Sequence, residues 1–273
     1  MPSASTSDAA SEPVSGPASG PASGVGETTR ELTVGPERLD RWLAGFLTRH
    51  GGPAAGSGGA DAPAGECSAG GSVEVSADGT SVTVYAADGA RVEGDVPFPP
   101  LVPPGGSDPA PPYAGLVAHA TRERTVGVVL VRMGGYAAGV FDGAVLRTSK
   151  VGSRLVQGRT AAGGWSQQRF ARRREKQARE AFAAAADVAA RVVLPHLSDL
   201  AAVVVGGDRR AVGQVLQDPR LAPLRALVTG PHLDVPDPKL AVLRATPERF
   251  RAVRLRLIEP DPPAPSAEPD RTA

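Results

Sequence analysis

The sequence predicts an α/β (α+β) fold: a mixed β-sheet flanked by helices, with a small N-terminal helix and β-meander region and disordered tails. Three observations lead to this prediction. Short β-branched runs alternate with helical segments from residue 113 onward, which is the order expected of an α/β or α+β core. An Ala-rich stretch at residues 165–194 contains neither Gly nor Pro, so it favours one long helix. The 33 glycines and 27 prolines gather in other segments, and such a surplus indicates unpacked chain.

Composition and charge exclude several kinds of protein. The formal net charge is +1, so the overall charge predicts no partner. The single cysteine, Cys67, excludes an internal disulfide and a multi-cysteine metal site, and the four histidines show no ligand spacing. We therefore expect no metal and no cofactor. No apolar run approaches the ~20 residues of a membrane span, and the first residues do not resemble a secretory signal. We expect a cytoplasmic protein with no membrane partner.

The N-terminal region predicts a disordered tail followed by a helix. Residues 1–29 are rich in Ser, Ala, Gly and Pro and contain the sequence GPAS twice, a composition that cannot offset the entropy of ordering. Pro36 and Gly51 mark the start and end of the helix that follows. Its apolar face repeats at i, i+3, i+4, i+7 and i+8, and consists of Leu39, Trp42, Leu43, Phe46 and Leu47.

The remainder of the region 30–112 predicts a flexible insertion, a β-meander and a linker. Residues 51–71 are Gly-, Ala- and Ser-rich, which is typical of flexible chain. Eight prolines between Pro97 and Pro112 indicate an extended linker. Between these segments valines alternate around two Asp-Gly turns, the pattern of antiparallel hairpins; they are Val73, Val75, Val82, Val84 and Val92, with turns at Asp78-Gly79 and Asp88-Gly89.

The region 113–259 carries the predicted mixed sheet. We expect a helix over 113–123, strands over 126–132, 139–142, 144–148 and 154–157, a helix from about Trp165 to Leu194, a strand over 201–205, and a last strand over 252–258. Pro195 ends the long helix, and Asp208 is expected to cap the helix after Gly206-Gly207. Residues 260–273 are Pro-rich and predict a second disordered tail.

Positive charge is concentrated in one segment. Between Arg147 and Arg179 ten basic residues face one acid, Glu175, so this window carries +9. The basic residues are Arg147, Lys150, Arg154, Arg159, Arg169, Arg172, Arg173, Arg174, Lys176 and Arg179. Four of them, at 169, 172, 173 and 176, recur at helical spacing. Such a stripe favours a polyanionic partner such as RNA; the alternative is a solvated helix face.

The segment before the long helix combines glycines with amides and a hydroxyl. Its sequence is Gly163-Gly164-Trp165-Ser166-Gln167-Gln168-Arg169-Phe170. It holds no His, Cys or carboxylate, so it lacks a conventional nucleophile and base. A helix N-terminus with free N–H groups could instead position water and stabilise an oxyanion. The alternative is a glycine turn with no chemistry.

The run GRTAAGGWSQQRFARRREKQ, residues 158–177, resembles the catalytic loop and following helix of eukaryotic/archaeal-type peptide chain release factors. Gly163, Gly164 and Ser166 match the GGQ glycines and the serine after them, and residues 169–172 match the basic helix. Trp165 stands where those factors have the catalytic glutamine. The run is therefore more similar to Vms-like release factors, peptidyl-tRNA hydrolases of ribosome rescue, whose loop reads Gly-x-x-Gln. Gly164-Trp165-Ser166-Gln167 fits that form, and the whole chain resembles the actinobacterial branch of the family.

This resemblance implies a function. Residues 113–259 would form a release-factor-like catalytic domain that hydrolyses peptidyl-tRNA on stalled large ribosomal subunits. Gln167 would orient the attacking water, while Gly163 and Gly164 would admit the CCA end. The remaining residues implied to bind tRNA or ribosomal RNA are Arg159, Trp165, Ser166, Gln168, Arg169, Arg172, Arg173 and Lys176. The protein is expected to act as a monomer. Two alternatives stay open: cleavage of the tRNA near its 3′ end, and RNA or ribosome binding without catalysis. No counterpart of a codon-reading domain is found.

Other motifs predict structure rather than chemistry. Gly206-Gly207-Asp208 lacks the Lys and Ser/Thr of a phosphate loop and is interpreted as a strand-to-helix turn. Asp208, Asp234 and Asp237 are not expected to bind Mg²⁺, because two of them lie beside prolines. Trp42 is predicted to belong to the core, whereas Trp165 could stack on a terminal base or anchor the loop.

Overall fold

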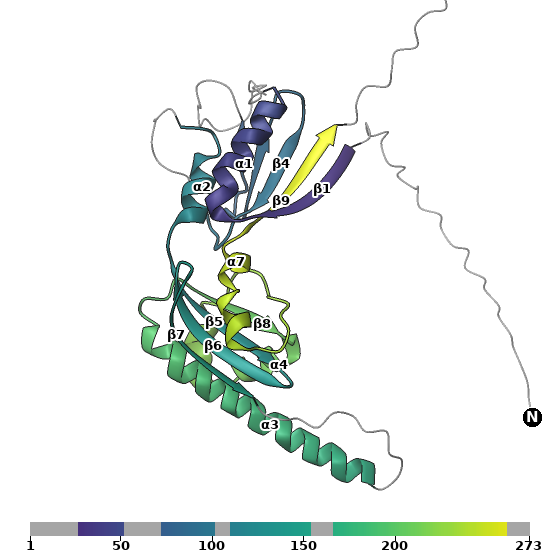
Figure 1. Ribbon diagram of the computed structural model, residues 1–273, viewed down its shortest axis with the longest axis vertical. Helices are drawn as coiled ribbons and strands as arrows, with labels where there is room; N and C mark the ends of the chain where they lie inside the picture. The colour runs from purple at the N-terminus through teal and green to yellow at the C-terminus, as the bar shows by residue number, and fades with distance from the viewer. Residues whose placement is uncertain (1–26, 52–71, 102–109, 154–165, 261–273) are drawn as a thin grey trace, which may run out of the picture.

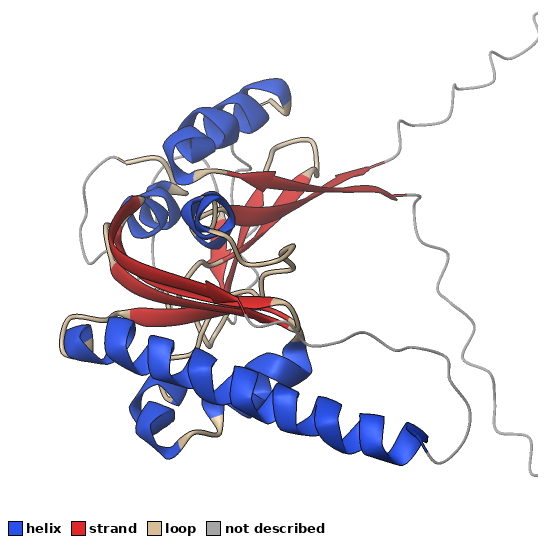
Figure 2. Cartoon of the chain, turned by 60° about the horizontal axis from the view of Figure 1, so that its bottom comes forward, coloured by secondary structure: helices blue, strands red, loops and turns tan. Residues whose placement is uncertain are grey.

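The computed structural model describes residues 27–51, 72–101, 110–153 and 166–260. Two β-sheets, each with helices packed against it, form two connected units (Figures 1 and 2). The strands are β1 Glu27–Val34, β2 Val73–Val75, β3 Ser81–Tyr85, β4 Arg91–Asp95, β5 Thr125–Arg132, β6 Gly135–Asp142, β7 Val145–Ser153, β8 Ala202–Gly207 and β9 Val253–Pro260. The α-helices are α1 Pro36–Arg49, α2 Ala114–Thr121, α3 Ser166–Val193, α4 Arg209–Leu216, α5 Ala222–Arg225, α6 Leu240–Arg244 and α7 Pro247–Phe250; the 3-10 helices are η1 Leu194–His196 and η2 Pro219–Leu221.

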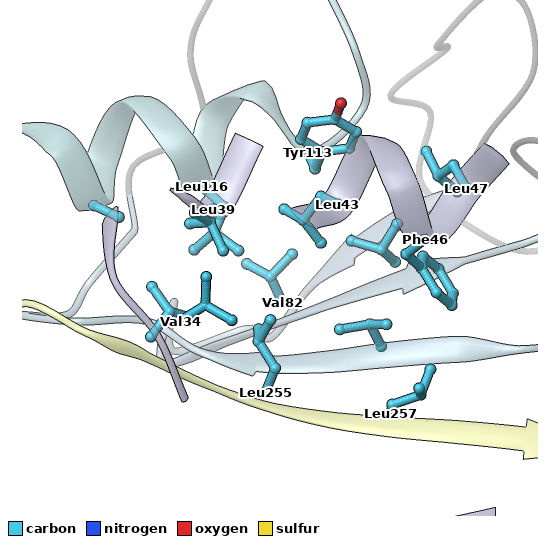
Figure 3. Close-up of a cluster of buried hydrophobic side chains, with 14 of the residues drawn as sticks. Val34, Leu39, Leu43, Phe46, Leu47, Val82, Tyr113, Leu116, Leu255 and Leu257 are labelled. Atoms are coloured by element: carbon cyan, nitrogen blue, oxygen red, sulfur yellow. The ribbon is translucent and has the colours of Figure 1, made fainter. Parts of the chain in front are cut away.

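The first unit is an antiparallel sheet in the order β1-β9-β4-β3-β2. Helices α1 and α2 cover one of its faces, and the apolar face of α1 points into the core, as predicted: Leu39, Leu43, Phe46 and Leu47 are buried against Val82, Leu255 and Leu257 (Figure 3). Pro36 occupies the first helical turn and Gly51 follows with φ of 76°, so the predicted helix signals are confirmed. Trp42 is partly buried and packs against this core.

The second unit is a mixed sheet in the order β7-β6-β5-β8, in which β5 and β8 run parallel. Helices α3 and α4 pack on one face, and α6 and α7 lie on the other. The valines of β5 and β8 are buried on both faces, as expected of parallel strands covered by helices. The predicted mixed sheet flanked by helices is therefore confirmed.

Several boundaries differ from the prediction. Residues 27–29, assigned to the tail, pair with residues 258–260 as part of β1. The prediction missed this strand because β1 lies at the sheet edge and is exposed over its first five residues. Its sequence therefore shows little of the alternation of apolar and polar residues that marks a strand. Strand β9 joins the first sheet between β1 and β4, and α2 packs on the same core. The division at residue 112 therefore does not coincide with the two sheets.

Other predicted segments agree or lie outside the described residues. The meander is confirmed as β2, β3 and β4, and the long helix as α3. Strand β7 runs on to Ser153, whereas the strand expected at 154–157 lies outside the described residues, as do residues 1–26, 52–71, 102–109 and 261–273. None of the helices in the described ranges combines the length and apolar character of a membrane span.

Candidate functional site

Helix α3 divides into an embedded half and a projecting half. Its buried residues begin at Ala181 and continue along the face that packs on the second sheet: Ala185, Ala186, Val188, Ala189, Val192 and Val193. Residues 166–180 precede this face. Figures 1 and 2 show that this half of α3 extends beyond the sheet, over about 22 Å at 1.5 Å per residue. We call residues 166–180 the α3 arm.

The α3 arm carries four exposed cations, three of which have no acidic partner among the described residues. Arg172, Arg173 and Arg179 are exposed, and the structure gives none of them an ion pair with a described residue. Lys176 is 74% exposed, and its Nζ lies 4.0 Å from Glu180 Oε1 one turn along the helix. This separation is at the limit for an ion pair, so the ammonium keeps most of its hydration. The exposure of these side chains agrees with the predicted basic stripe.

The rest of the basic window is less uniform. Arg147, on β7, pairs with Asp142 through Nε and Oδ2 at 3.1 Å, so this cation is partly neutralised. Lys150, on the same strand, is exposed. Arg154 and Arg159 lie outside the described residues. The free charge of the window, where the structure describes it, is therefore greatest on the arm.

The part of the predicted catalytic loop that the structure describes is the first turn of α3, at the tip of the arm. Ser166, Gln167, Gln168 and Arg169 form the first turn of α3, as the sequence predicted, whereas Gly163, Gly164 and Trp165 lie outside the described residues. The first N–H groups of a helix have no acceptor within the helix and carry the positive end of its dipole. The backbone of Gln167 and Gln168 thus lies where an anion or a developing oxyanion is favoured.

An ionic cluster fastens the embedded half of α3. Arg220, in η2, lies 2.8 Å from Asp187 of α3 and 2.7 Å from Asp218. Hydrogen bonds from the Arg220 side chain and backbone lower the pKa of Asp218 to about 2, and the two carboxylates raise the pKa of Arg220. The cluster links α3 to the segment after α4, close to the buried face that supports the arm.

The Gly206-Gly207-Asp208 turn has a structural role. Gly207 has φ of 98°, and a Cβ placed there would lie 2.2 Å from the Val131 carbonyl oxygen. The Asp208 side chain accepts a hydrogen bond from Ala211 N at 2.9 Å and caps α4. The predicted strand-to-helix turn is therefore confirmed. Within the described residues no three His, Cys, Asp or Glu side chains are placed to hold a metal.

A polar junction between the two units was missed by sequence reasoning. His119 of α2 is 7% exposed, and its Nε2 lies 2.9 Å from the Pro97 carbonyl oxygen. Arg124 Nη1 donates to the His119 carbonyl at 2.9 Å, and its guanidinium lies 5.4 Å from the Phe98 ring centroid. Burial and the Arg124 charge lower the pKa of His119, although its contact with Pro97 acts the other way. A lone His and a lone Arg give no sequence signal for such a contact.

One protein-family model matches this chain. The family model described as "Actinobacteria/chloroflexi VLRF1 release factor" matches residues 124–256, just under half of the chain. This range runs from the start of β5 through the α3 arm and into β9. A comparison with curated proteins finds no match to this chain.

Two solved structures show weaker likenesses. The archaeal translation termination factor aRF1 is 14% identical, with a TM-score of 0.33, and the match covers 59% of this chain and 46% of that one. A structure described as an archaeal protein has the same identity and TM-score, with 62% and 51% covered. The chain thus spans about half the length of the solved structures that it matches. At these TM-scores neither likeness supports an inference about activity. The family match covers the second unit and the first residues of β9: residues 124–256 are similar to the Actinobacteria/chloroflexi VLRF1 release factor family.

Proposed function

We propose that this protein is a peptidyl-tRNA hydrolase of ribosome rescue, which releases the nascent peptide from tRNA on a stalled large ribosomal subunit in the cytoplasm. The observation that carries the proposal is the α3 arm within the release-factor family match. Its cations lie along residues 169–179, which we call the shaft, and its first turn, which contains Gln167 and Gln168, lies at the tip. An arm of about 22 Å suits an ester bond that lies in a recess of an RNA particle.

The chemistry proposed for the tip requires no ionisable side chain. Water adds to the ester carbonyl, the acyl–oxygen bond breaks, and the proton from water goes to the tRNA oxygen as the peptide leaves. Gln167, a neutral amide, would orient this water. The N–H groups of the first turn of α3 would stabilise the negative charge that develops on the carbonyl oxygen, and Gly163 and Gly164 would let the backbone approach the CCA end closely.

The shaft would supply binding rather than catalysis. Arg169, Arg172, Arg173 and Lys176 would hold phosphates of tRNA or ribosomal RNA, with Arg159, Trp165, Ser166 and Gln168 as further contacts near the loop. Arg172 and Arg173 favour this role, because they are exposed and have no acidic partner among the described residues, so their charge is available to a polyanion. Binding and catalysis would therefore be separable by substitution.

The test compares Gln167→Ala with Gln168→Ala in single-turnover peptide release from peptidyl-tRNA on isolated large subunits. We expect Gln167→Ala to slow release by about 10²–10³, as for the loss of one preorganised donor, while subunit binding is retained. Gln168→Ala is the matched control, since it removes an adjacent amide. If Gln168→Ala is the inactive variant, the register is wrong by one residue.

The same assay separates the alternatives. Intact tRNA with a free 3′ hydroxyl is the expected product, whereas a shortened tRNA would identify a nuclease that cuts near the 3′ end. Full release by both variants would place catalysis outside this loop, whereas no release by the wild-type protein would leave an RNA- or ribosome-binding protein.

A further inference from the structure

A second group of arginines without partners lies on α1, in the first unit. Arg38, Arg41 and Arg49 are exposed, and the structure gives none of them an ion pair with a described residue. At 100° per residue they fall within an arc of about 80° on one flank of the helix. We call these three residues the α1 ridge. The ridge points away from the core, because the leucines and Phe46 on the opposite face of α1 point into it (Figure 3).

The surroundings of the α1 ridge leave its charge available. Glu37 lies one turn before Arg41, but its carboxylate pairs with Arg251 through Oε1 and Nη1 at 2.9 Å, and Asp40 lies about 100° further around the helix. Gly45 lies between Arg41 and Arg49 along the ridge. An added Cβ at Gly45 would lie 3.3 Å from Arg49 Nη1, so the Arg49 guanidinium lies back over the helix toward the other two arginines. The three charges therefore lie along one continuous surface.

A partly exposed aromatic side chain borders this surface. Trp42 lies one turn after Arg38, and residues four apart are neighbours on a helix. Its indole stacks parallel to the Phe46 ring, with centroids 6.1 Å apart, and is only partly buried. Unpaired arginines beside an accessible indole are the combination that binds the phosphates and bases of RNA.

We propose that the α1 ridge, with Trp42, is a second RNA-binding surface of this protein. It lies in the unit away from the α3 arm (Figure 1), so the two surfaces engage different RNA segments. The inference rests on the proposed function in taking ribosomal RNA as the ligand, but it requires no chemistry at Gln167. It assigns a role to the part of the chain that lies before the family match.

The test uses the full chain, a fluorescein-labelled RNA hairpin and isolated large subunits, with affinities measured from about 50 to 200 mM salt. The variant is Arg38→Gln/Arg41→Gln/Arg49→Gln. The matched control, Arg225→Gln/Lys239→Gln/Arg244→Gln, removes three exposed cations of the second unit that have no ion pair with a described residue. We expect the ridge variant to lose two to three units of log–log salt slope, since each phosphate contact contributes about 0.7–0.9. The control should keep the wild-type slope, and both should melt at the wild-type temperature.

A separate measurement reports on Trp42. The chain has two tryptophans, so in a Trp165→Phe background fluorescence comes from Trp42 alone. We expect the hairpin to quench it, whereas an indole with only a packing role would be unaffected.

Three results would overturn the proposal. Unchanged affinity and slope in the ridge variant would show a solvated helix face. Weaker binding to subunits with unchanged hairpin binding would indicate an acidic protein surface as the partner. An equal loss of slope in the control would show that any three cations suffice. Failure of the proposed catalysis is detected separately, because Gln167→Ala is measured by peptide release and these variants by RNA binding.

Discussion

The open face of the first sheet and the α3 arm both carry arginines, but only the arginines of the sheet face form ion pairs with acids. On the sheet face, Arg91 pairs with Glu27 at 2.9 Å, Arg254 with Asp95 at 3.2 Å, and Arg256 with Glu93 at 3.0 Å. On the arm, Arg172, Arg173 and Arg179 have no acidic partner among the described residues. The arginine count of a region therefore does not reveal its role; the placement of acids does.

Paired and unpaired cations contribute differently to the stability of the free protein. Exposed ion pairs contribute at most about 1 kcal/mol each to the free energy of unfolding. The main effect of the pairs on the sheet face is therefore to cancel its charge. Unpaired cations on one helix repel each other and weaken the free helix. That repulsion is relieved when a polyanion binds. The arm therefore gains from binding a polyanion, whereas the arginines of the sheet face already have acidic partners.

The largest expected effect concerns the turn that supports the second unit. Gly207→Ala forces a Cβ to within 2.2 Å of the Val131 carbonyl oxygen at φ of 98°. We expect a loss of about 2–4 kcal/mol in the free energy of unfolding, measured by urea denaturation. Gly213→Ala in α4 is the matched control: nothing lies within 4 Å of the added Cβ, and it should gain up to about 1 kcal/mol. Equal stability of the two variants would contradict the close packing at Gly207.

The next effect tests whether β1 completes the first unit. Chains beginning at Glu27 or at Arg30, both ending at Pro260, differ only in residues 27–29. The shorter chain loses three β1–β9 pairs and the Glu27 partner of Arg91, so we expect its melting temperature to fall by several degrees. Coincident thermal transitions would show that residues 27–29 add nothing to the sheet.

A smaller, pH-dependent effect is expected at the base of the arm. The pKa of Asp218 is lowered to about 2 by Arg220. A carboxyl whose folded pKa is depressed stabilises the fold above its unfolded pKa, and this contribution is lost as pH falls through the folded value. Arg220→Gln should therefore lower the melting temperature most above about pH 4. The difference from wild type should shrink as pH falls toward 2 and vanish below it, and a constant difference would contradict the assignment.

Much of the fold could be predicted from the sequence because its signals are local. The apolar face of α1, the two Asp-Gly turns and the Gly- and Pro-free α3 each lie within a short window. The position of β9 between β1 and β4 could not be predicted, because it depends on pairing between residues more than 150 apart in the chain, such as Arg256 and Glu93.

The candidate site divides in the same way. The basic stripe and the loop motif were visible in one run of residues. The projection of the arm was not, because it depends on where the sheet ends and α3 continues. The availability of each cation also required the structure: Arg147 counted equally in the charge window, but Asp142 neutralises it.

The central claim is that the exposed cations of the α3 arm bind RNA while the ion-paired arginines of the sheet face do not. The most direct test measures the salt dependence of binding to isolated large subunits for Arg173→Gln/Lys176→Gln and for Arg254→Gln. The arm variant is predicted to lose about one unit of log–log slope per substitution, with an unchanged melting temperature. Arg254→Gln is predicted to keep the wild-type slope. A wild-type slope in the arm variant, or an equal loss in Arg254→Gln, would contradict the account.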